Sequence, residues 1–182
     1  MGKFIIFAQP WWVNLLIFIP FIAYFLWKRK KIRITNQILI ITTIFGIAFG
    51  FLEAAVIVYL RSGLGLLPKY AIKPSDIAQL PQTLFTIEIF REVATIIMLV
   101  SVAFLSIKTP KERSAIFLWV FAIWDIFYYA SLKIAVNWPT SLLTEDVLFL
   151  IPVPWVSQVW FPILISFLTL LAVIFSRKNT KS

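Results

Sequence analysis

Long apolar stretches alternate with short polar or basic segments along the whole chain. Five of these stretches approach or exceed the length of about 20 residues that an α-helix needs to cross roughly 30 Å of hydrocarbon. They cover residues 11–27, 34–60, 83–107, 114–136 and 155–176. The pattern predicts an all-α protein, a polytopic transmembrane helical bundle of about five spans that forms a single domain over residues 1–182.

The connection before the last apolar stretch has a different character. Residues 138–154 contain Glu145 and Asp146 and are interrupted by prolines. The segment is too broken to span a bilayer as a helix and too apolar for a free loop. We therefore expect an interfacial or re-entrant segment over residues 138–154.

Lysine and arginine are distributed unequally between the two sides of such a bundle. One side holds Lys28, Arg29, Lys30, Lys31, Arg33, Lys108, Lys111, Arg113, Arg177, Lys178 and Lys181, and the other holds Lys3, Arg61, Lys69 and Lys73. Cytoplasmic loops carry the excess of positive residues in membrane proteins. The N-terminus is therefore predicted to lie outside and the C-terminus in the cytoplasm, in a multi-pass protein of a prokaryotic inner or plasma membrane.

Composition narrows the chemistry that this chain can support. It is 61% hydrophobic and 14% charged, against about 45–50% and about 25% in typical soluble proteins. The formal net charge of +9 comes from residues at helix ends, so we expect the lipid bilayer as a partner and no nucleic acid. With no Cys and no His in the chain, thiol or imidazole catalysis and the usual zinc and haem ligands are excluded. We assign no metal site and no cofactor.

Five ionisable residues lie inside the apolar stretches. They are Glu53, Glu88, Arg91, Glu92 and Asp125. Charge at membrane depth costs a few kcal/mol per residue, and such residues usually pair with each other or serve a substrate, ion or proton path. In the predicted topology all five fall at the bilayer centre or in its outer half. Their common depth predicts one site that opens to the outside.

Helical spacing groups these residues further. Glu88, Arg91 and Glu92 share one face of the third stretch, because residues three and four apart are neighbours on a helix. Asp125 shares a face with Tyr128 on the fourth stretch, and Asp146 is a candidate lid residue on the connection that follows. The predicted binding residues are therefore Glu53, Glu88, Arg91, Glu92, Asp125, Tyr128 and Asp146. The alternative is a structural network in which Arg91 bridges Glu53 or Asp125.

Small residues on the second stretch indicate close helix packing. Gly46 and Gly50 form a GxxxG pattern, and Glu53 follows on nearly the same face. Small residues at this spacing allow two helix backbones to approach closely. Packing is the expected role of the glycines, and it would carry Glu53 towards the third stretch.

A family resemblance rests on three segments. They are WDIFYYASLKIAVNWPTSLLTEDVLFLIPVPW at residues 124–155, Gly50-Phe51-Leu52-Glu53-Ala54-Ala55, and Arg91-Glu92. Together they resemble a family of small polytopic prokaryotic membrane proteins of unassigned function. The resemblance implies a helical membrane fold, and it implies that Glu53, Arg91, Glu92, Asp125 and Asp146 act as a set.

Three functional hypotheses remain open at this point. The first is an integral membrane protein whose carboxylate and arginine site binds or transports a cation, protons or a small polar molecule. The second is an accessory subunit of a larger membrane complex, with the buried charges paired across subunits. The third is an intramembrane enzyme that acts on an outer-leaflet lipid, although no reaction is assigned. Five spans without an internal repeat make a small transporter, so a homo-oligomer is a further expected arrangement.

Overall fold

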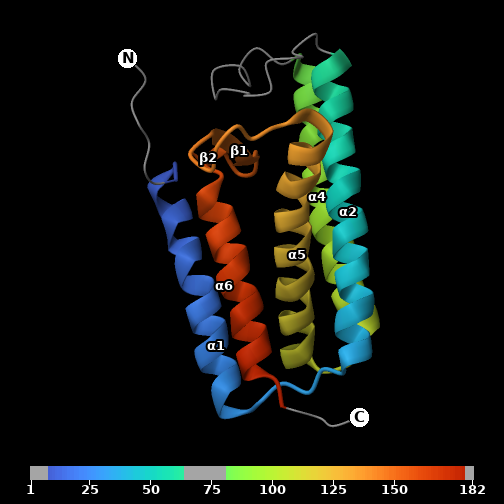
Figure 1. Ribbon diagram of the computed structural model, residues 1–182, viewed down its shortest axis with the longest axis vertical. Helices are drawn as coiled ribbons and strands as arrows, with labels where there is room; N and C mark the ends of the chain where they lie inside the picture. Colours follow the sequence, from blue (N-terminus) through green and yellow to red (C-terminus); the bar gives the residue numbers. More distant parts are fainter. Residues whose placement is uncertain (1–7, 64–80, 179–182) are drawn as a thin grey trace.

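Helices make up most of the computed structural model, which describes residues 8–63 and 81–178 (Figure 1). The elements in chain order are the 3₁₀ helix η1 (Trp11–Phe18), α1 (Ile19–Arg29), α2 (Asn36–Gly63), α4 (Gln82–Ser106), α5 (Pro110–Val136), β1 (Glu145–Phe149), β2 (Trp155–Gln158) and α6 (Trp160–Ser176). The prediction of a helical bundle is confirmed. The small sheet is an addition that the hydrophobic pattern did not predict.

In the described part of the chain, four helical segments are long and apolar enough to cross a membrane. They are Trp11–Arg29, Asn36–Leu60, Gln82–Ser106 and Pro110–Val136. The remaining apolar helix, α6, has 17 residues and therefore rises about 26 Å. This length is slightly less than the roughly 30 Å of a hydrocarbon core. The four long helices fit a multi-pass membrane protein.

The outside of the bundle is apolar, and the buried side carries the charge. On α4, Phe90 and Leu105 are exposed, whereas Glu88, Glu92 and Thr95 are buried. A surface helix of a water-soluble protein has the opposite arrangement, with apolar residues facing the core. The inverted arrangement on α4 is the one expected where lipid surrounds the bundle.

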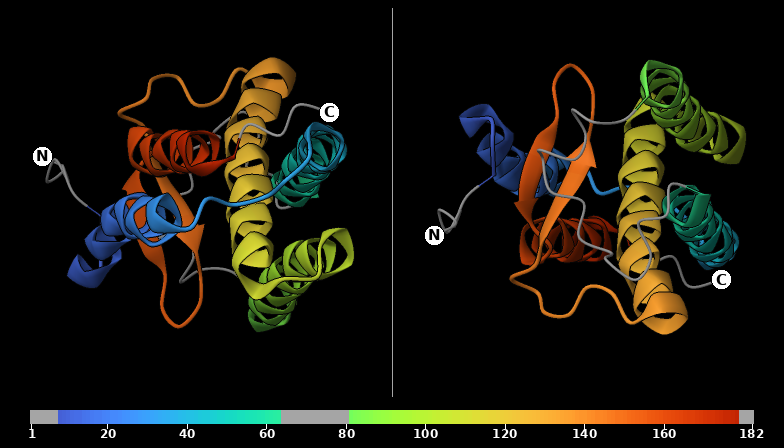
Figure 2. Two further views of the ribbon diagram at one scale, coloured as in Figure 1. Left: turned by 90° about the horizontal axis from the view of Figure 1, so that it is seen from below. Right: turned by 90° about the horizontal axis from the view of Figure 1, so that it is seen from above.

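Helix α5 occupies the centre of the bundle. It packs against α2, α4 and α6, and α1 packs against the other side of α6. Seen along the bundle, α5 stands between α6 on one side and α2 and α4 on the other (Figure 2). Ile116 and Val120 of α5 are fully buried. Residues on α5 therefore face several neighbouring helices, so a site formed by several helices can be centred on α5.

The glycines of α2 pack closely against another helix, as their spacing predicts, and that helix is α5. A Cβ atom built on Gly46 would come within 2.7 Å of Ile123 Cγ2, and one built on Gly50 would come within 2.7 Å of the Trp124 carbonyl oxygen. The Trp124 oxygen belongs to the α5 backbone, which cannot yield as a flexible side chain can. Gly50 thus sets the distance between α2 and α5.

We expect Gly50→Ala to destabilise the protein, because the added methyl group forces the two helix backbones apart. Overpacking of this kind typically costs about 1–3 kcal/mol. Gly63→Ala is the matched control, since a Cβ at Gly63 meets nothing within 4 Å. Thermal unfolding in detergent should show a lower midpoint for Gly50→Ala alone. Equal midpoints for the two variants would contradict the close approach at Gly50.

Part of the segment 138–154 forms a β-hairpin with the residues that follow it, and the interfacial or re-entrant place of this segment stays a prediction. β1 and β2 pair antiparallel, with Asp146 opposite Ser157, and Val156 also exchanges two backbone hydrogen bonds of 2.8 Å with Gln9. The prediction that the last span begins at Trp155 was wrong, because residues 155–158 belong to β2. Hydropathy does not separate an apolar strand from the first turn of an apolar helix. In this hairpin, the backbone N–H and C=O groups form hydrogen bonds by strand pairing.

The connections at the opposite end of the bundle meet one another. The Arg33 amide donates to Glu112 Oε1 at 3.2 Å, and Arg177 Nε donates to the Ile34 carbonyl at 3.1 Å. Most of the basic residues behind the topology prediction belong to this end. Lys3, Lys69, Lys73 and Lys181 lie outside the described residues, as do the other members of the segments 1–7, 64–80 and 179–182. The hairpin and the basic connections therefore mark two chemically different ends.

Candidate functional site

A cavity of about 170 Å³ lies beneath the hairpin. Residues of α2, α4, α5, α6, η1 and both strands line it. All seven residues singled out from the sequence are among them: Glu53, Glu88, Arg91, Glu92, Asp125, Tyr128 and Asp146. A volume of this size accommodates several water molecules or a small ligand. The structure thus brings the predicted residues together, and their binding role stays a prediction.

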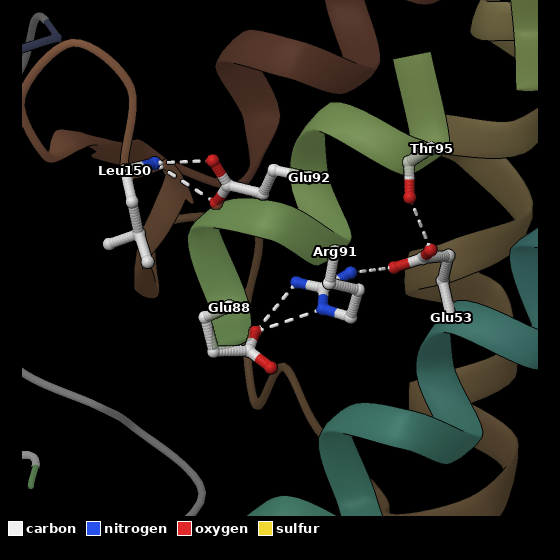
Figure 3. A network of polar contacts seen from close by, with 6 residues as sticks. All are labelled: Glu53, Glu88, Arg91, Glu92, Thr95 and Leu150. Carbon is white, nitrogen blue, oxygen red and sulfur yellow. Dashed lines mark hydrogen bonds and ion pairs between the residues drawn. The ribbon is translucent and has the colours of Figure 1, made fainter. Parts of the chain in front are cut away.

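Arg91 forms an ion-paired triad with two of the carboxylates (Figure 3). Its Nη1 atom pairs with Glu53 Oε2 across the α2–α4 interface, and its Nε and Nη2 atoms reach Glu88 Oε2 at 2.9 and 2.8 Å. The hydroxyl of Thr95 donates to Glu53 Oε1 at 2.7 Å. This arrangement matches the structural alternative in which Arg91 bridges Glu53. The triad connects α2 to α4 through charge-assisted hydrogen bonds, which are stronger than neutral ones.

The Glu92 carboxylate binds the turn between β1 and β2, whereas Arg91 pairs with Glu53 and Glu88. Both of its carboxylate oxygens accept from the Leu150 backbone amide at 3.0 Å (Figure 3). Leu150 follows β1 directly, in the turn that leads to β2. The carboxylate therefore holds the hairpin over the cavity, and within residues 8–63 and 81–178 it accepts from a neutral donor.

Two further acids also have neutral hydroxyl donors. Ser166 Oγ of α6 donates to Asp125 Oδ2 at 2.8 Å, and the Tyr129 hydroxyl of α5 donates to Asp146 Oδ2 at 3.0 Å. Asp125 is 91% buried, since its residual exposure is 9%. No hydrogen bond to its second oxygen, Oδ1, is seen within residues 8–63 and 81–178. Asp125 thus offers the cavity an acceptor that the described part of the protein does not fill.

The charges of the described residues in the cavity do not balance. Among residues 8–63 and 81–178, five carboxyl groups and one guanidinium line it, a formal excess of four negative charges when every group is ionised. Arg91 is engaged with Glu53 and Glu88, and the donors described above for Glu92 and Asp125, the Leu150 amide and the Ser166 hydroxyl, are neutral. A buried carboxylate without a cationic partner is costly. The arrangement favours the uptake of positive charge, either as protons or as a bound cation.

Aromatic side chains form much of the remaining wall. Three ring pairs contribute: Phe121 with Trp124, Tyr128 with Tyr129, and Phe149 with Trp155, at centroid distances of 5.2, 5.0 and 5.5 Å. All six residues line the cavity. The first two pairs stand on α5 and the third on the hairpin, so aromatic faces and edges surround the acids from two sides.

The carboxylates do not converge as metal ligands do. Among the described residues, no group of three or more Asp, Glu, His or Cys side chains is arranged to hold a metal ion. The acids are instead distributed around the cavity wall, each against its own partner. The described carboxylates therefore line a cavity and do not form a metal coordination shell.

Two partners of the acids were not predicted from the sequence. One is the hydroxyl of Ser166, and the other is the backbone amide of Leu150. A signal for the first exists, because Ser166 and Thr169 are three residues apart in an otherwise apolar stretch and are both buried. The Leu150 amide leaves no signal, since every residue except proline carries the same donor.

The comparisons with known proteins add no name to this geometry. The search against protein families, the search of curated proteins and the search of solved structures each found no match. The resemblance to a family of small polytopic prokaryotic membrane proteins thus stays a prediction from three segments of the sequence. The site is characterised by its own residues: an acidic, aromatic cavity within a helical bundle whose four long apolar helices fit a multi-pass membrane protein.

Proposed function

We propose that this chain is a membrane protein that binds, and exchanges with the outside, a cation, protons or a small polar molecule. The proposal rests on the acidic excess of the described cavity lining, with five carboxyl groups against one guanidinium. Ionisable groups buried at membrane depth usually serve a solute or proton path when they are not fully paired with one another. The triad around Arg91 is the structural part of the site. Glu92, Asp125 and Asp146 are the part that meets the solute.

In the proposed membrane arrangement, five spans cross the bilayer and the hairpin lies on the outer side. The fifth span is α6, whose 17 residues lie at the lower end of the range of about 17–25 residues for a spanning helix. The basic connections next to Arg33 and Arg177 lie on the cytoplasmic side, following the positive-inside rule. The cavity then opens in the outer half of the bundle, under the hairpin.

Cysteine labelling tests this orientation on a chain that contains no natural cysteine. Ser141→Cys lies in the connection after α5, and Ser114→Cys lies near the start of α5; both positions are exposed. A membrane-impermeant maleimide added to intact cells should label Ser141→Cys and leave Ser114→Cys unmodified until the cells are opened. The reverse pattern would place the hairpin in the cytoplasm.

The proposed binding role is tested with purified protein in weakly buffered detergent solution. Candidate cations are added one at a time at constant ionic strength, and both the unfolding midpoint and the release of protons are recorded. A bound cation should raise the midpoint, because it binds the folded state alone, or should displace protons from the cavity. Loss of either response in Glu92→Gln and Asp125→Asn would support the proposal, and the absence of any such response would overturn it.

A further inference from the structure

We propose that the preferred solute of this cavity is an organic ammonium ion, bound with one N–H group on Asp125 Oδ1 and its alkyl part against the aromatic walls. This inference rests on the proposed function and specifies its ligand class. It depends on three features of the cavity: the unfilled acceptor on Asp125, the aromatic ring pairs, and the scattered arrangement of the carboxylates.

Asp125 supplies the charge and the hydrogen bond. Its Oδ2 atom is held by Ser166 Oγ at 2.8 Å, which fixes the carboxylate on the α5–α6 interface. Its Oδ1 atom has no hydrogen bond within the described residues, although the side chain is 91% buried. Oδ1 is therefore the oxygen of Asp125 that can accept from a solute in the cavity. An ammonium group fills it with a charge-assisted hydrogen bond, the strong class of such contacts.

The aromatic residues supply the surface for the carbon-bearing part of the ligand. Trp124 is adjacent to Asp125 on α5, and Tyr128 lies about one turn further along the helix. Phe149 and Trp155 approach from the hairpin. Cations bound over aromatic faces are attracted by the ring quadrupole, and ammonium ligands are the common biological example. A wall of rings beside a carboxylate is therefore better suited to an alkylated cation than to a bare ion.

An inorganic cation meets a less favourable site. Calcium requires six to eight oxygen ligands and magnesium a near-octahedral set. In the described chain the carboxylates form no such group. Glu53 and Glu88 are taken up by Arg91, and Glu92 accepts twice from the Leu150 amide. These three carboxylates are thus committed to separate partners and do not form one oxygen shell for a hard cation.

The probe is n-butylammonium, which carries one charge, N–H donors and a short apolar tail. n-Butanol is its neutral counterpart, and potassium and magnesium chloride are the inorganic controls. Binding is followed by tryptophan fluorescence in detergent, because Trp124 and Trp155 line the cavity. The expected result is saturable binding of n-butylammonium that Asp125→Asn weakens tenfold or more. Trp155→Leu should weaken it several-fold, whereas Trp155→Phe, which keeps an aromatic face, should retain most of it.

The outcomes separate the inference from the function on which it rests. Equal responses to n-butanol and n-butylammonium, or equal affinity in wild type and Asp125→Asn, would overturn the ammonium inference. If only potassium, magnesium or protons give a response, and that response depends on Asp125, the ammonium inference is overturned and the proposed function is retained. If neither cation binding nor proton release depends on Glu92 or Asp125, both proposals fail. Folding of each variant is checked by circular dichroism, and Trp155→Phe supplies the aromatic test if Trp155→Leu does not fold.

Discussion

Replacing Arg91 with alanine is expected to lower the free energy of unfolding by about 3–5 kcal/mol, the range typical for removal of one partner from a buried ion pair. The substitution leaves Glu53 and Glu88 buried without their guanidinium. It also removes the ion pair that joins α2 to α4. Thermal and denaturant unfolding in detergent measure the change.

Two control variants separate stranded charge from lost packing. Arg91→Lys keeps the positive charge and loses the forked geometry that reaches both carboxylates. Its free energy of unfolding should therefore lie between those of the wild type and Arg91→Ala. The triple variant Arg91→Met, Glu53→Gln, Glu88→Gln removes all three charges and should recover part of the loss. An Arg91→Ala protein as stable as wild type would show that the triad contributes nothing to the fold.

Glu92→Gln and Asp125→Asn are expected to fold almost normally and to lose cation binding by about tenfold or more, equivalent to at least about 1.4 kcal/mol of binding free energy. Each amide keeps an oxygen that can accept the native hydrogen bond, from the Leu150 amide at residue 92 and from Ser166 at residue 125. Only the negative charge is removed. Ligand binding and uptake into liposomes are measured beside the unfolding midpoint.

Glu112→Gln is the matched control for these variants. Glu112 is also a buried acid and also accepts from a backbone amide, that of Arg33, but it lies at the basic end of the bundle. Its replacement should leave cation binding unchanged. Fully active Glu92→Gln and Asp125→Asn proteins would remove the functional interpretation, and the cavity acids would then form a structural charge network.

The arrangement of the site assigns separate tasks to neighbouring residues of one helix. On α4, Arg91 faces α2 and pairs with Glu53, while Glu92 faces the hairpin and accepts from Leu150. Adjacent residues on a helix point about 100° apart, so one turn of α4 contacts two different neighbours. This geometry explains why a single polar stripe in the sequence contains both a structural and a proposed functional part.

The hairpin was the part of the fold least accessible to sequence reasoning. Residues 145–158 are apolar enough to resemble an interfacial segment and the start of a helix, and they pair instead as β1 and β2. The decision depends on backbone partners, including Gln9, that are far away in the sequence. Periodicity within a short segment carries no information about such partners.

The sequence by itself determined the helical bundle, the close helix packing at Gly46 and Gly50, and seven polar residues that line the cavity; that α5 is the partner of these glycines was decided by the tertiary structure. Each follows from local physics: apolar length, the absence of a side chain on glycine, and the cost of charge in an apolar stretch. Only the tertiary structure decided which carboxylate meets which donor. Arg91 reaches Glu53 across 38 positions of sequence, and Ser166 reaches Asp125 across 41. Such pairings depend on how whole helices rotate and pack against one another, and a linear pattern of polar residues does not contain that information.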